Sequence, residues 1–215
     1  MKYILMDLDG TITNPKLGIT KSLQYALKHW DIVIDDLDTL TKHIGPPLKD
    51  TFTEDYGFSE EEAIKGIKVY REYFEVDGLY ENEVYEGMQE LLEKLKNADM
   101  SLIVATSKPE RMARQILEHF SLADYFDDIC GAAPDDTRSK KEEVIRYALQ
   151  RNDITDFCEV VMVGDRKYDV EGAKTVGITS IGVLYGFGSR EELKEAGADR
   201  IAGTVKELYE VIMNI

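Results

Sequence analysis

The stretch Leu5–Thr11, LMDLDGT, completes the first apolar run of the chain and places two acids where that run ends. The preceding Ile4–Met6 segment suits a buried strand. Asp7 and Asp9 are separated by one residue, so on a strand both side chains point the same way. Two carboxylates facing one small volume disfavour joint ionisation unless a cation or a shared proton lies with them. A short apolar run that ends in paired acids therefore predicts a functional site.

Length and composition bound the class of protein. The chain has 215 residues, 43% hydrophobic and 32% charged, which is typical of a soluble globular protein with one large or two small domains. Its 42 acidic and 26 basic residues give a net charge of −16. Nucleic acids are bound through neutralising lysines and arginines, so this balance argues against a nucleic-acid partner. A small anionic substrate would need local cations to attract it.

The cysteines and the N-terminus favour a cytoplasmic protein. Cys130 and Cys158 lie in or beside apolar runs, which predicts buried thiols in a reducing compartment. The N-terminal MKYILMDLDG has too short an apolar stretch for a secretory signal. No run of about 18 apolar residues occurs, so we expect no membrane span. The sequence does not indicate an oligomeric state.

From residue 84 onward, apolar runs alternate with helical patterns. The expected strands are 101–106, 126–132, 159–165, 179–186 and 199–203, after a first strand at the N-terminus. The expected helices are 84–98, 109–120, about 140–151, 170–176, one after Ser189, and 205–215. Such alternation predicts the α/β class, with a doubly wound, Rossmann-like parallel sheet.

Residues 14–82 break this rhythm. Helical spacing of apolar residues covers 18–30 and 59–74, and Ser59 with Glu62 predicts a capping box at the start of the second helix. We therefore expect a core domain formed by 1–13 and 83–215, and a helical cap domain formed by 14–82. An insertion directly after the first strand could cover the paired acids as a lid.

Polar side chains follow several of the expected strands. In open α/β sheets, ligands bind beyond the carboxyl ends of the strands. The residues placed there are Asp7, Asp9, Thr11, Thr106, Ser107, Asp165 and, one turn later, Asp169. Four carboxylates at one edge require a cation, and Mg²⁺ prefers oxygen ligands and often bridges to a phosphate. Lys140 and Lys141, at the start of a helix, could attract an anionic substrate.

Four segments carry a family resemblance: DLDGT (7–11), VATS (104–107), SKKEEV (139–144) and VGDRKYD (163–169). In this order they resemble the four motifs of the haloacid dehalogenase superfamily. Within it, the chain looks like the phosphoglycolate-phosphatase-like phosphohydrolases with a helical cap after the first motif. The resemblance implies a hydrolase of a small soluble phosphate ester that uses Mg²⁺.

The resemblance also implies roles for residues of the core. Asp7 would be the nucleophile that becomes an aspartyl phosphate, and Asp9 would be the general acid and then the base. Thr106 would hydrogen-bond a phosphoryl oxygen, with Ser107 as the alternative or as a further substrate contact. Lys141 would neutralise phosphoryl charge, with Lys140 as the alternative. Mg²⁺ would be held by Asp7, the Asp9 main-chain carbonyl and Asp165, with Asp169 ligating or orienting.

The cap and the substrate are less determined. His43 and Lys49 resemble a cap loop that contacts substrate in this family. Phosphoglycolate, a nucleoside 5′-monophosphate, a sugar phosphate or pyrophosphate all fit the same core. The alternatives are a phosphomutase of the β-phosphoglucomutase kind and, from another class, a regulatory binding protein on an inactive scaffold. A dehalogenase is disfavoured by the second acid, and a phosphonate-cleaving lyase by the lack of a distinctive cap lysine.

Overall fold

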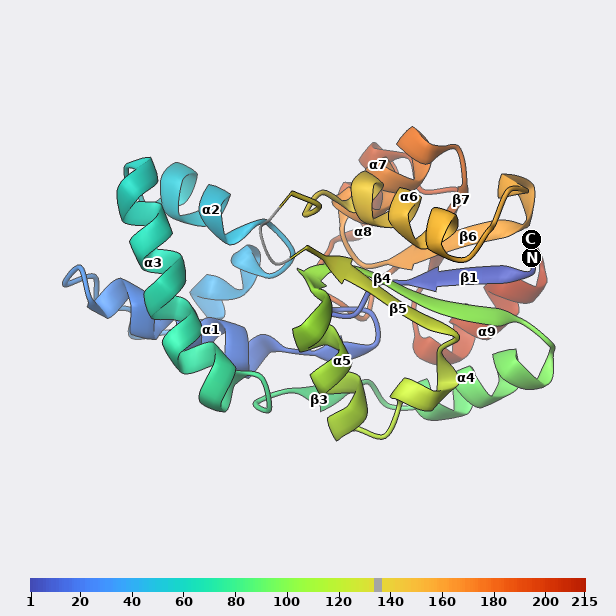
Figure 1. Cartoon of the computed structure of the whole chain (residues 1–215), viewed down its shortest axis with the longest axis horizontal. Helices are drawn as coiled ribbons and strands as arrows, with labels where there is room; N and C mark the ends of the chain where they lie inside the picture. The colour runs from blue at the N-terminus through green and yellow to red at the C-terminus, as the bar shows by residue number, and fades with distance from the viewer. Residues whose placement is uncertain (134–136) are drawn as a thin grey trace. The chain divides into compact units, whose positions relative to one another are not determined.

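The protein is built on a six-stranded parallel sheet, shown in Figure 1. A computed structural model describes residues 1–133 and 137–215. The sheet consists of β1 (Tyr3–Met6), β4 (Ser101–Pro109), β5 (Asp128–Ala132), β6 (Val160–Gly164), β7 (Thr179–Val183) and β8 (Arg200–Ala202). Their order is β5-β4-β1-β6-β7-β8, and every neighbouring pair is parallel. The expected α/β fold with a doubly wound parallel sheet is confirmed.

The strand order places β1 at a topological switch point. From β1 the sheet grows to one side through β4 and β5, and the chain then returns to add β6 on the other side of β1. In the register, Met6 lies beside both Val104 and Val163. The residues that follow these three strands therefore leave the sheet side by side, where ligands bind in this class of fold.

Helices cover both faces of this sheet. They are α4 (Met88–Asn97), α5 (Glu110–His119), α6 (Lys141–Arg151), α7 (Lys167–Val176), α8 (Arg190–Ala196) and α9 (Val205–Met213), with short 3₁₀ turns η4 (Ala123–Tyr125) and η5 (Phe157–Glu159). In Figure 1, α6 and α7 lie over one face, and α4, α5 and α9 lie over the other. Under α6 and α7, the core includes Leu5, Ile103, Val144, Met162 and Ala173, all buried.

Several element boundaries and one cysteine differ from expectation: α7 begins three residues earlier than expected, at Lys167, and β7 ends three residues earlier, at Val183. The helix expected from residue 84 begins at Met88, because Gly87 has a φ of 80° that a helix cannot contain. The strand expected over 101–106 extends to Pro109, with an irregularity in its pairing to β5. Cys130 is buried as expected, but Cys158 is exposed because it lies in the turn η5 before β6 rather than in the strand.

The chain divides into two compact units, Met1–Asn14 with Val84–Ile215 and Pro15–Glu83. We call them the core and the insert. The insert contains α1 (Lys16–Lys28), η1 (Leu37–His43), α2 (Leu48–Asp50), η2 (Thr51–Asp55), α3 (Glu60–Tyr73) and η3 (Phe74–Gly78). The strands β2 (Thr13–Asn14) and β3 (Glu83–Val84) form a two-stranded sheet where the chain passes between the units.

The insert has its own apolar interior. Leu23 and Leu27 of α1 and Phe52 of η2 are fully buried. The capping box of α3 is present: Ser59 Oγ accepts from the Glu62 amide at 3.3 Å, and the Ser59 amide donates to Glu62 Oε2 at 2.9 Å. At 14 residues α3 is the longest described helix, and within 1–133 and 137–215 no helix has the length and apolar character needed to cross a bilayer.

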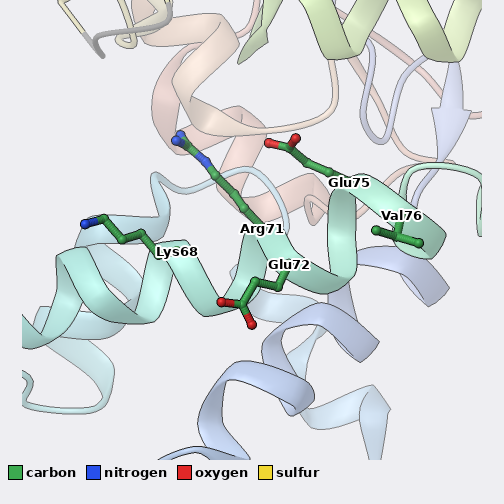
Figure 2. A pocket seen from close by; sticks show the side chains of 5 residues that line it. All are labelled: Lys68, Arg71, Glu72, Glu75 and Val76. Atoms are coloured by element: carbon green, nitrogen blue, oxygen red, sulfur yellow. The ribbon is translucent and has the colours of Figure 1, made fainter.

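A pocket is lined by residues of α3 and η3 (Figure 2). Lys68, Arg71, Glu72, Glu75 and Val76 line it. Arg71 is half-buried at this pocket, and its guanidinium points to the same side of the helix as the Glu75 carboxylate in Figure 2. The pocket therefore mixes charges of both signs, which gives no preference for an anion.

Candidate active site

Asp7 and Asp169 share one ammonium group. Lys141, at the first position of α6, lies with Nζ 2.8 Å from Asp7 Oδ1 and 2.7 Å from Asp169 Oδ1, and it donates to the Ala105 carbonyl at 3.2 Å. All three residues are almost fully buried. Lys141 thus connects the ends of β1 and β4 with the first turn of α7. The neighbouring Lys140 is exposed.

Asp165 completes a cluster of carboxylates. It follows β6 directly and is fully buried. In the described part of the chain, oxygen atoms of Asp7, Asp165 and Asp169 lie within 4.8 Å of one another, the arrangement of a candidate metal site. Asp165 Oδ2 accepts a hydrogen bond from the Phe187 amide at 2.8 Å, whereas its buried Oδ1 has no partner among the described residues.

The turn after Asp9 explains the glycine of the first motif. Gly10 has a φ of 84°, a conformation that residues with a Cβ rarely adopt. A Cβ added at this position would lie 2.2 Å from Asp165 Oδ2. Gly10 therefore lets the backbone turn and also leaves the space that the Asp165 carboxylate occupies.

Asp9 has a partner that the sequence analysis did not identify. Lys108, near the end of β4, forms an ion pair with Asp9 Oδ2, and both side chains are largely buried. The Lys108 amide also donates to Thr106 Oγ at 3.2 Å, so the buried Thr106 and Lys108 belong to one turn of chain. Ser107 between them is half-buried. In the sequence, Lys108 directly follows Thr106 and Ser107, two expected site residues. This position is the sequence feature that could have identified it.

The environment changes the protonation of this cluster. Burial raises the pKa of Asp9, although Lys108 opposes the shift. Burial and the Asp169 charge raise the pKa of Asp165. Burial also raises the pKa of Asp169 to about 6, against the effect of Lys141. Burial opposes the charge on Lys141, but the Asp169 and Asp7 carboxylates outweigh it and raise the Lys141 pKa.

The cluster carries more negative than positive charge. Two ammonium groups, Lys108 and Lys141, face four carboxylates, which leaves an excess of two negative charges if all four are ionised. Arg166 is near but forms an ion pair with Glu192 at 2.9 Å. Buried charge of this kind is stable only when it is neutralised. The all-oxygen donor set, its charge excess and the unpartnered Asp165 oxygen fit a hard divalent cation such as Mg²⁺.

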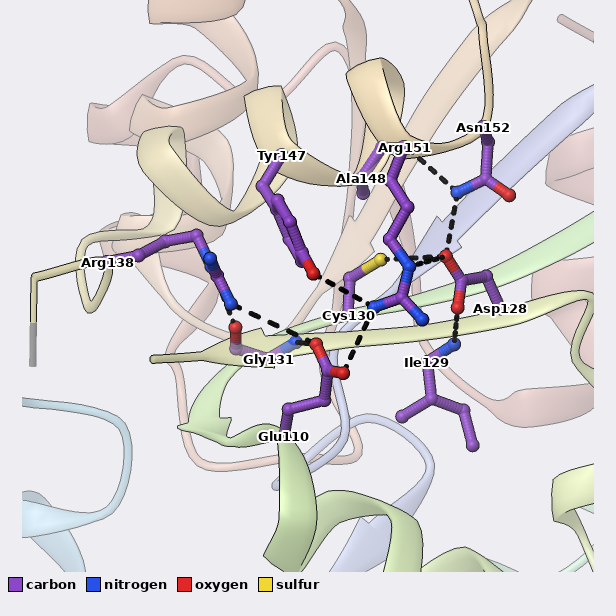
Figure 3. Close-up of polar contacts among 10 residues, drawn as sticks. All are labelled: Glu110, Asp128, Ile129, Cys130, Gly131, Arg138, Tyr147, Ala148, Arg151 and Asn152. Atoms are coloured by element: carbon purple, nitrogen blue, oxygen red, sulfur yellow. Dashed lines mark hydrogen bonds and ion pairs between the residues drawn. The ribbon is translucent and has the colours of Figure 1, made fainter. Parts of the chain in front are cut away.

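A polar network supports the segment that precedes Lys141 (Figure 3). Arg151 contacts Glu110 and Asp128, each at 3.0 Å. The Arg138 guanidinium lies 3.5 Å from the centre of the Tyr147 ring, and its Nε donates to the Gly131 carbonyl at 3.1 Å. These contacts attach β5 and the chain before α6 to the body of α6, which fixes the helix start that carries Lys141.

Two tyrosines near the acids were not among the expected site residues. The rings of Tyr85 and Tyr185 meet edge-on with centroids 4.9 Å apart. Burial, followed by the Asp165 charge, raises the pKa of both, so both phenols remain protonated. Tyr185 opens the YGFG stretch (185–188) after β7, which from the sequence alone could either line the site or simply reverse the chain. Tyr85 directly follows β3, and no sequence pattern identifies it.

The expected cap residues differ in accessibility. His43 is buried within the insert, with Nδ1 3.4 Å from Asp55 Oδ2 and Nε2 3.4 Å from the Tyr56 hydroxyl. Burial lowers the pKa of His43. Lys49 is exposed and lies 3.4 Å from Glu60. Lys49 is therefore the more accessible of the two for a ligand, whereas His43 contacts the interior of its own unit.

Comparisons with known proteins assign the family. The family model described as haloacid dehalogenase-like hydrolase matches residues 4–183. The chain belongs to this family. A crystal structure of a predicted phosphatase from Clostridium acetobutylicum superposes with a TM-score of 0.97 at 50% identity, covering 100% of this chain and 99% of the other. The resemblance inferred from the four motifs is thereby confirmed.

Two relatives of this haloacid dehalogenase-like hydrolase are named for two different activities. A 5′-nucleotidase from Pseudomonas aeruginosa is 47% identical over 192 residues, which is 89% of this chain and 86% of the relative. The tyrosine-protein kinase PtkA from Mycobacterium tuberculosis is 36% identical over 215 residues, which is 98% of this chain and 72% of the relative. The family together with the phosphatase-type relatives confirms the expectation of a phosphatase of this family.

Proposed function

We propose that this phosphatase hydrolyses small phosphate monoesters, nucleoside 5′-monophosphates first among them, with Mg²⁺ and through an aspartyl phosphate on Asp7. The observation that carries the proposal is the buried cluster of Asp7, Asp165 and Asp169 around Lys141, with its excess of negative charge. Such a cluster is unfavourable in an empty protein interior. It suits a centre that accepts a divalent cation and a phosphoryl group.

In the first step, a carboxylate oxygen of Asp7 attacks phosphorus and the bond from phosphorus to the ester oxygen breaks. The leaving oxygen takes its proton from Asp9. The raised Asp9 pKa supports this role, because a carboxyl that retains its proton at a higher pH is available as an acid. Splitting one displacement into two through a covalent intermediate makes each step easier.

In the second step, water attacks the phosphorus of phospho-Asp7. Asp9, now ionised, accepts a proton from that water, and the bond from Asp7 to phosphorus breaks to release inorganic phosphate. General acid and base catalysis of this kind contributes about 10²–10⁴-fold to the rate. Lys108 would orient Asp9 for both proton transfers, through a hydrogen bond to the protonated carboxyl and an ion pair with the ionised one.

Positive charge and donors at the site would stabilise the transferring group. Lys141 contacts Asp7 and would share its charge with the phosphoryl oxygens, and the Thr106 hydroxyl would donate to one of them. Mg²⁺ held by Asp7, Asp165, the Asp9 carbonyl and Asp169 would neutralise phosphoryl charge. Preorganised charge of this type is usually the largest single contribution to such a reaction.

Substrate selection would belong to the insert. The 47% identical relative named 5′-nucleotidase supports a nucleoside 5′-monophosphate as the first substrate to test. The net charge of −16 supports a small substrate rather than a nucleic-acid polymer. Binding energy from the part of the substrate that does not react could close the insert over the core and exclude water.

The test is phosphate release from a substrate panel with Mg²⁺ and with excess chelator. The panel contains nucleoside 5′-monophosphates, phosphoglycolate, sugar phosphates and pyrophosphate, and Asp7→Asn protein serves as the background control. We expect Mg²⁺-dependent release, highest for a nucleoside monophosphate. Full activity in chelator would contradict the metal role, and no release from any compound would contradict the phosphatase activity.

Two further assays test for activities other than phosphate ester hydrolysis. Isomerised sugar phosphate without phosphate release would indicate a mutase. Transfer of phosphate from ATP to protein tyrosine, tested because of the 36% identical kinase, would indicate a phosphotransferase. Tight ligand binding with no chemistry in any assay would indicate a regulatory binding protein, which the intact acids at all four positions argue against.

A further inference from the structure

The loop Tyr185–Gly188 packs directly onto Asp165. A Cβ at Gly186 would lie 2.3 Å from the Gly10 carbonyl oxygen and 2.4 Å from Asp165 Cβ, and a Cβ at Gly188 would lie 1.9 Å from the Asp165 carbonyl oxygen. These neighbours are backbone or buried atoms that cannot move aside easily. The two glycines are therefore required for the loop to lie this close to the acid cluster.

The close approach gives the two oxygens of Asp165 different environments. Oδ2 accepts the 2.8 Å hydrogen bond from the Phe187 amide, and Oδ1 is buried without a partner in the described chain. Oδ2 is thereby oriented by the main chain of the loop, whereas Oδ1 has no partner that would orient it. Carboxylates around metal ions are commonly oriented by hydrogen bonds of this kind.

Tyr185 contributes a second unsatisfied group at the same place. Its hydroxyl oxygen is buried and has no hydrogen-bond partner among residues 1–133 and 137–215. Its ring is held edge-on by Tyr85. Buried hydroxyls in folded proteins nearly always have a partner, and a partner absent from the chain is commonly water or a ligand. Tyr185 directly precedes Gly186, where a Cβ would lie 2.4 Å from Asp165 Cβ, and the Asp165 charge acts on its phenol.

We propose that the loop Tyr185–Gly188 is an outer support of the metal centre. Its Phe187 amide presents Asp165 to the ion through a single oxygen, and the Tyr185 hydroxyl hydrogen-bonds a water molecule of the ion's hydration shell. Mg²⁺ usually keeps several waters when it binds to protein, so such a water is available. The inference rests on the proposed Mg²⁺ centre and makes Tyr185 a positioning residue.

The test is Mg²⁺ binding itself, measured by calorimetry on wild-type, Tyr185→Phe and Tyr85→Phe proteins without substrate. Tyr185→Phe removes one hydroxyl and keeps the ring, and we expect its dissociation constant for Mg²⁺ to rise by about 10-fold, as for other outer ligands of metal sites. Tyr85→Phe is the matched control, because its ring contacts Tyr185 and it also experiences the Asp165 charge. Its Mg²⁺ affinity should be unchanged.

Two further measurements separate positioning from folding. The melting temperature of the metal-free Tyr185→Phe protein should equal that of the wild type, and saturating Mg²⁺ should restore its kcat. Equal Mg²⁺ dissociation constants for wild-type and Tyr185→Phe proteins, or a loss of kcat that Mg²⁺ does not restore, would overturn the inference alone. Failure of the wild-type protein to bind Mg²⁺ would overturn the proposed metal centre, and the inference with it.

Discussion

The core and the insert distribute their polar side chains differently. In the core, side chains from three distant segments converge: Asp7, Lys141, and Asp165 with Asp169 contact or face one another in a buried space. In the insert, polar groups form separate local pairs, such as His43 with Asp55 and Lys49 with Glu60. Most large apolar side chains left exposed also belong to the insert, Val33 and Val76 among them.

This difference follows from the geometry of the two units. Parallel strands end at one edge of the sheet, so residues far apart in sequence meet there, and buried charges at that edge need partners. Helices of an insert distribute polar residues around their surfaces, with no common edge. The comparison leads us to expect chemistry to depend on core residues and substrate ranking to depend on the insert.

The largest expected effect is that of Asp7→Asn. An amide neither attacks phosphorus usefully nor binds a metal as an anion, so we expect kcat to fall by about 10⁴-fold or more, as when other covalent nucleophiles are removed. Phosphate release from the preferred substrate and from an aryl phosphate should fall together. Substantial turnover by a clean preparation would remove Asp7 as the nucleophile.

The lysine pair at the start of α6 provides a matched comparison inside the core. Lys141→Ala removes an ammonium group that contacts Asp7 and Asp169, and we expect kcat to fall by about 10²–10³-fold through lost stabilisation of phosphoryl charge. Lys140→Ala, at the exposed neighbour, should leave kcat unchanged. Steady-state kinetics on both variants measures this. A reversed result would mean that the neighbouring lysine acts at the site.

A smaller effect is expected from Lys108→Met, which leaves Asp9 buried without its partner. We expect the loss in kcat to be less than the ~10²–10⁴-fold that removal of the acid–base group itself causes, because Asp9 remains but is oriented less well. The decrease should be larger for an alkyl phosphate than for an aryl phosphate, whose leaving group needs little protonation. An equal decrease for both substrates would show that Lys108 does not act through Asp9.

More of the structure of the core than of the insert could be predicted from the sequence. The alternation after residue 84 predicted the parallel sheet, and the strand ends predicted which acids would meet, because both depend on sheet geometry alone. The pairing of Lys108 with Asp9 was missed because it depends on the path of the chain after β4. Tyr85 and Tyr185 meet through two loops that no periodicity relates. In the insert, the capping box at Ser59 could be predicted because it is local, whereas the burial of His43 depends on tertiary packing.

The smallest effects are expected from the insert. Lys49→Ala should change the ratio of kcat/KM for the preferred ester to kcat/KM for an aryl phosphate, with little change for the aryl ester. Lys65→Ala is the control, because Lys65 is likewise exposed and paired with a glutamate of α3, Glu61. His43→Ala should lower the melting temperature as well, since His43 is buried. If kcat/KM of the Lys49→Ala protein falls equally for the preferred ester and the aryl phosphate, the insert does not select the substrate.

The central claim is that the acids at the end of β1 divide the chemistry, with Asp7 carrying the phosphoryl group and Asp9 moving protons. The most direct measurement is mass spectrometry of Asp9→Asn protein, quenched in acid after mixing with Mg²⁺ and an aryl phosphate, whose leaving group needs little protonation by Asp9. Loss of the base should slow hydrolysis of the intermediate, so we predict that one phosphoryl group accumulates on the peptide containing Asp7. Phosphorylation of a different residue, or turnover of substrate with Asp7 never phosphorylated at any time point, would contradict the account.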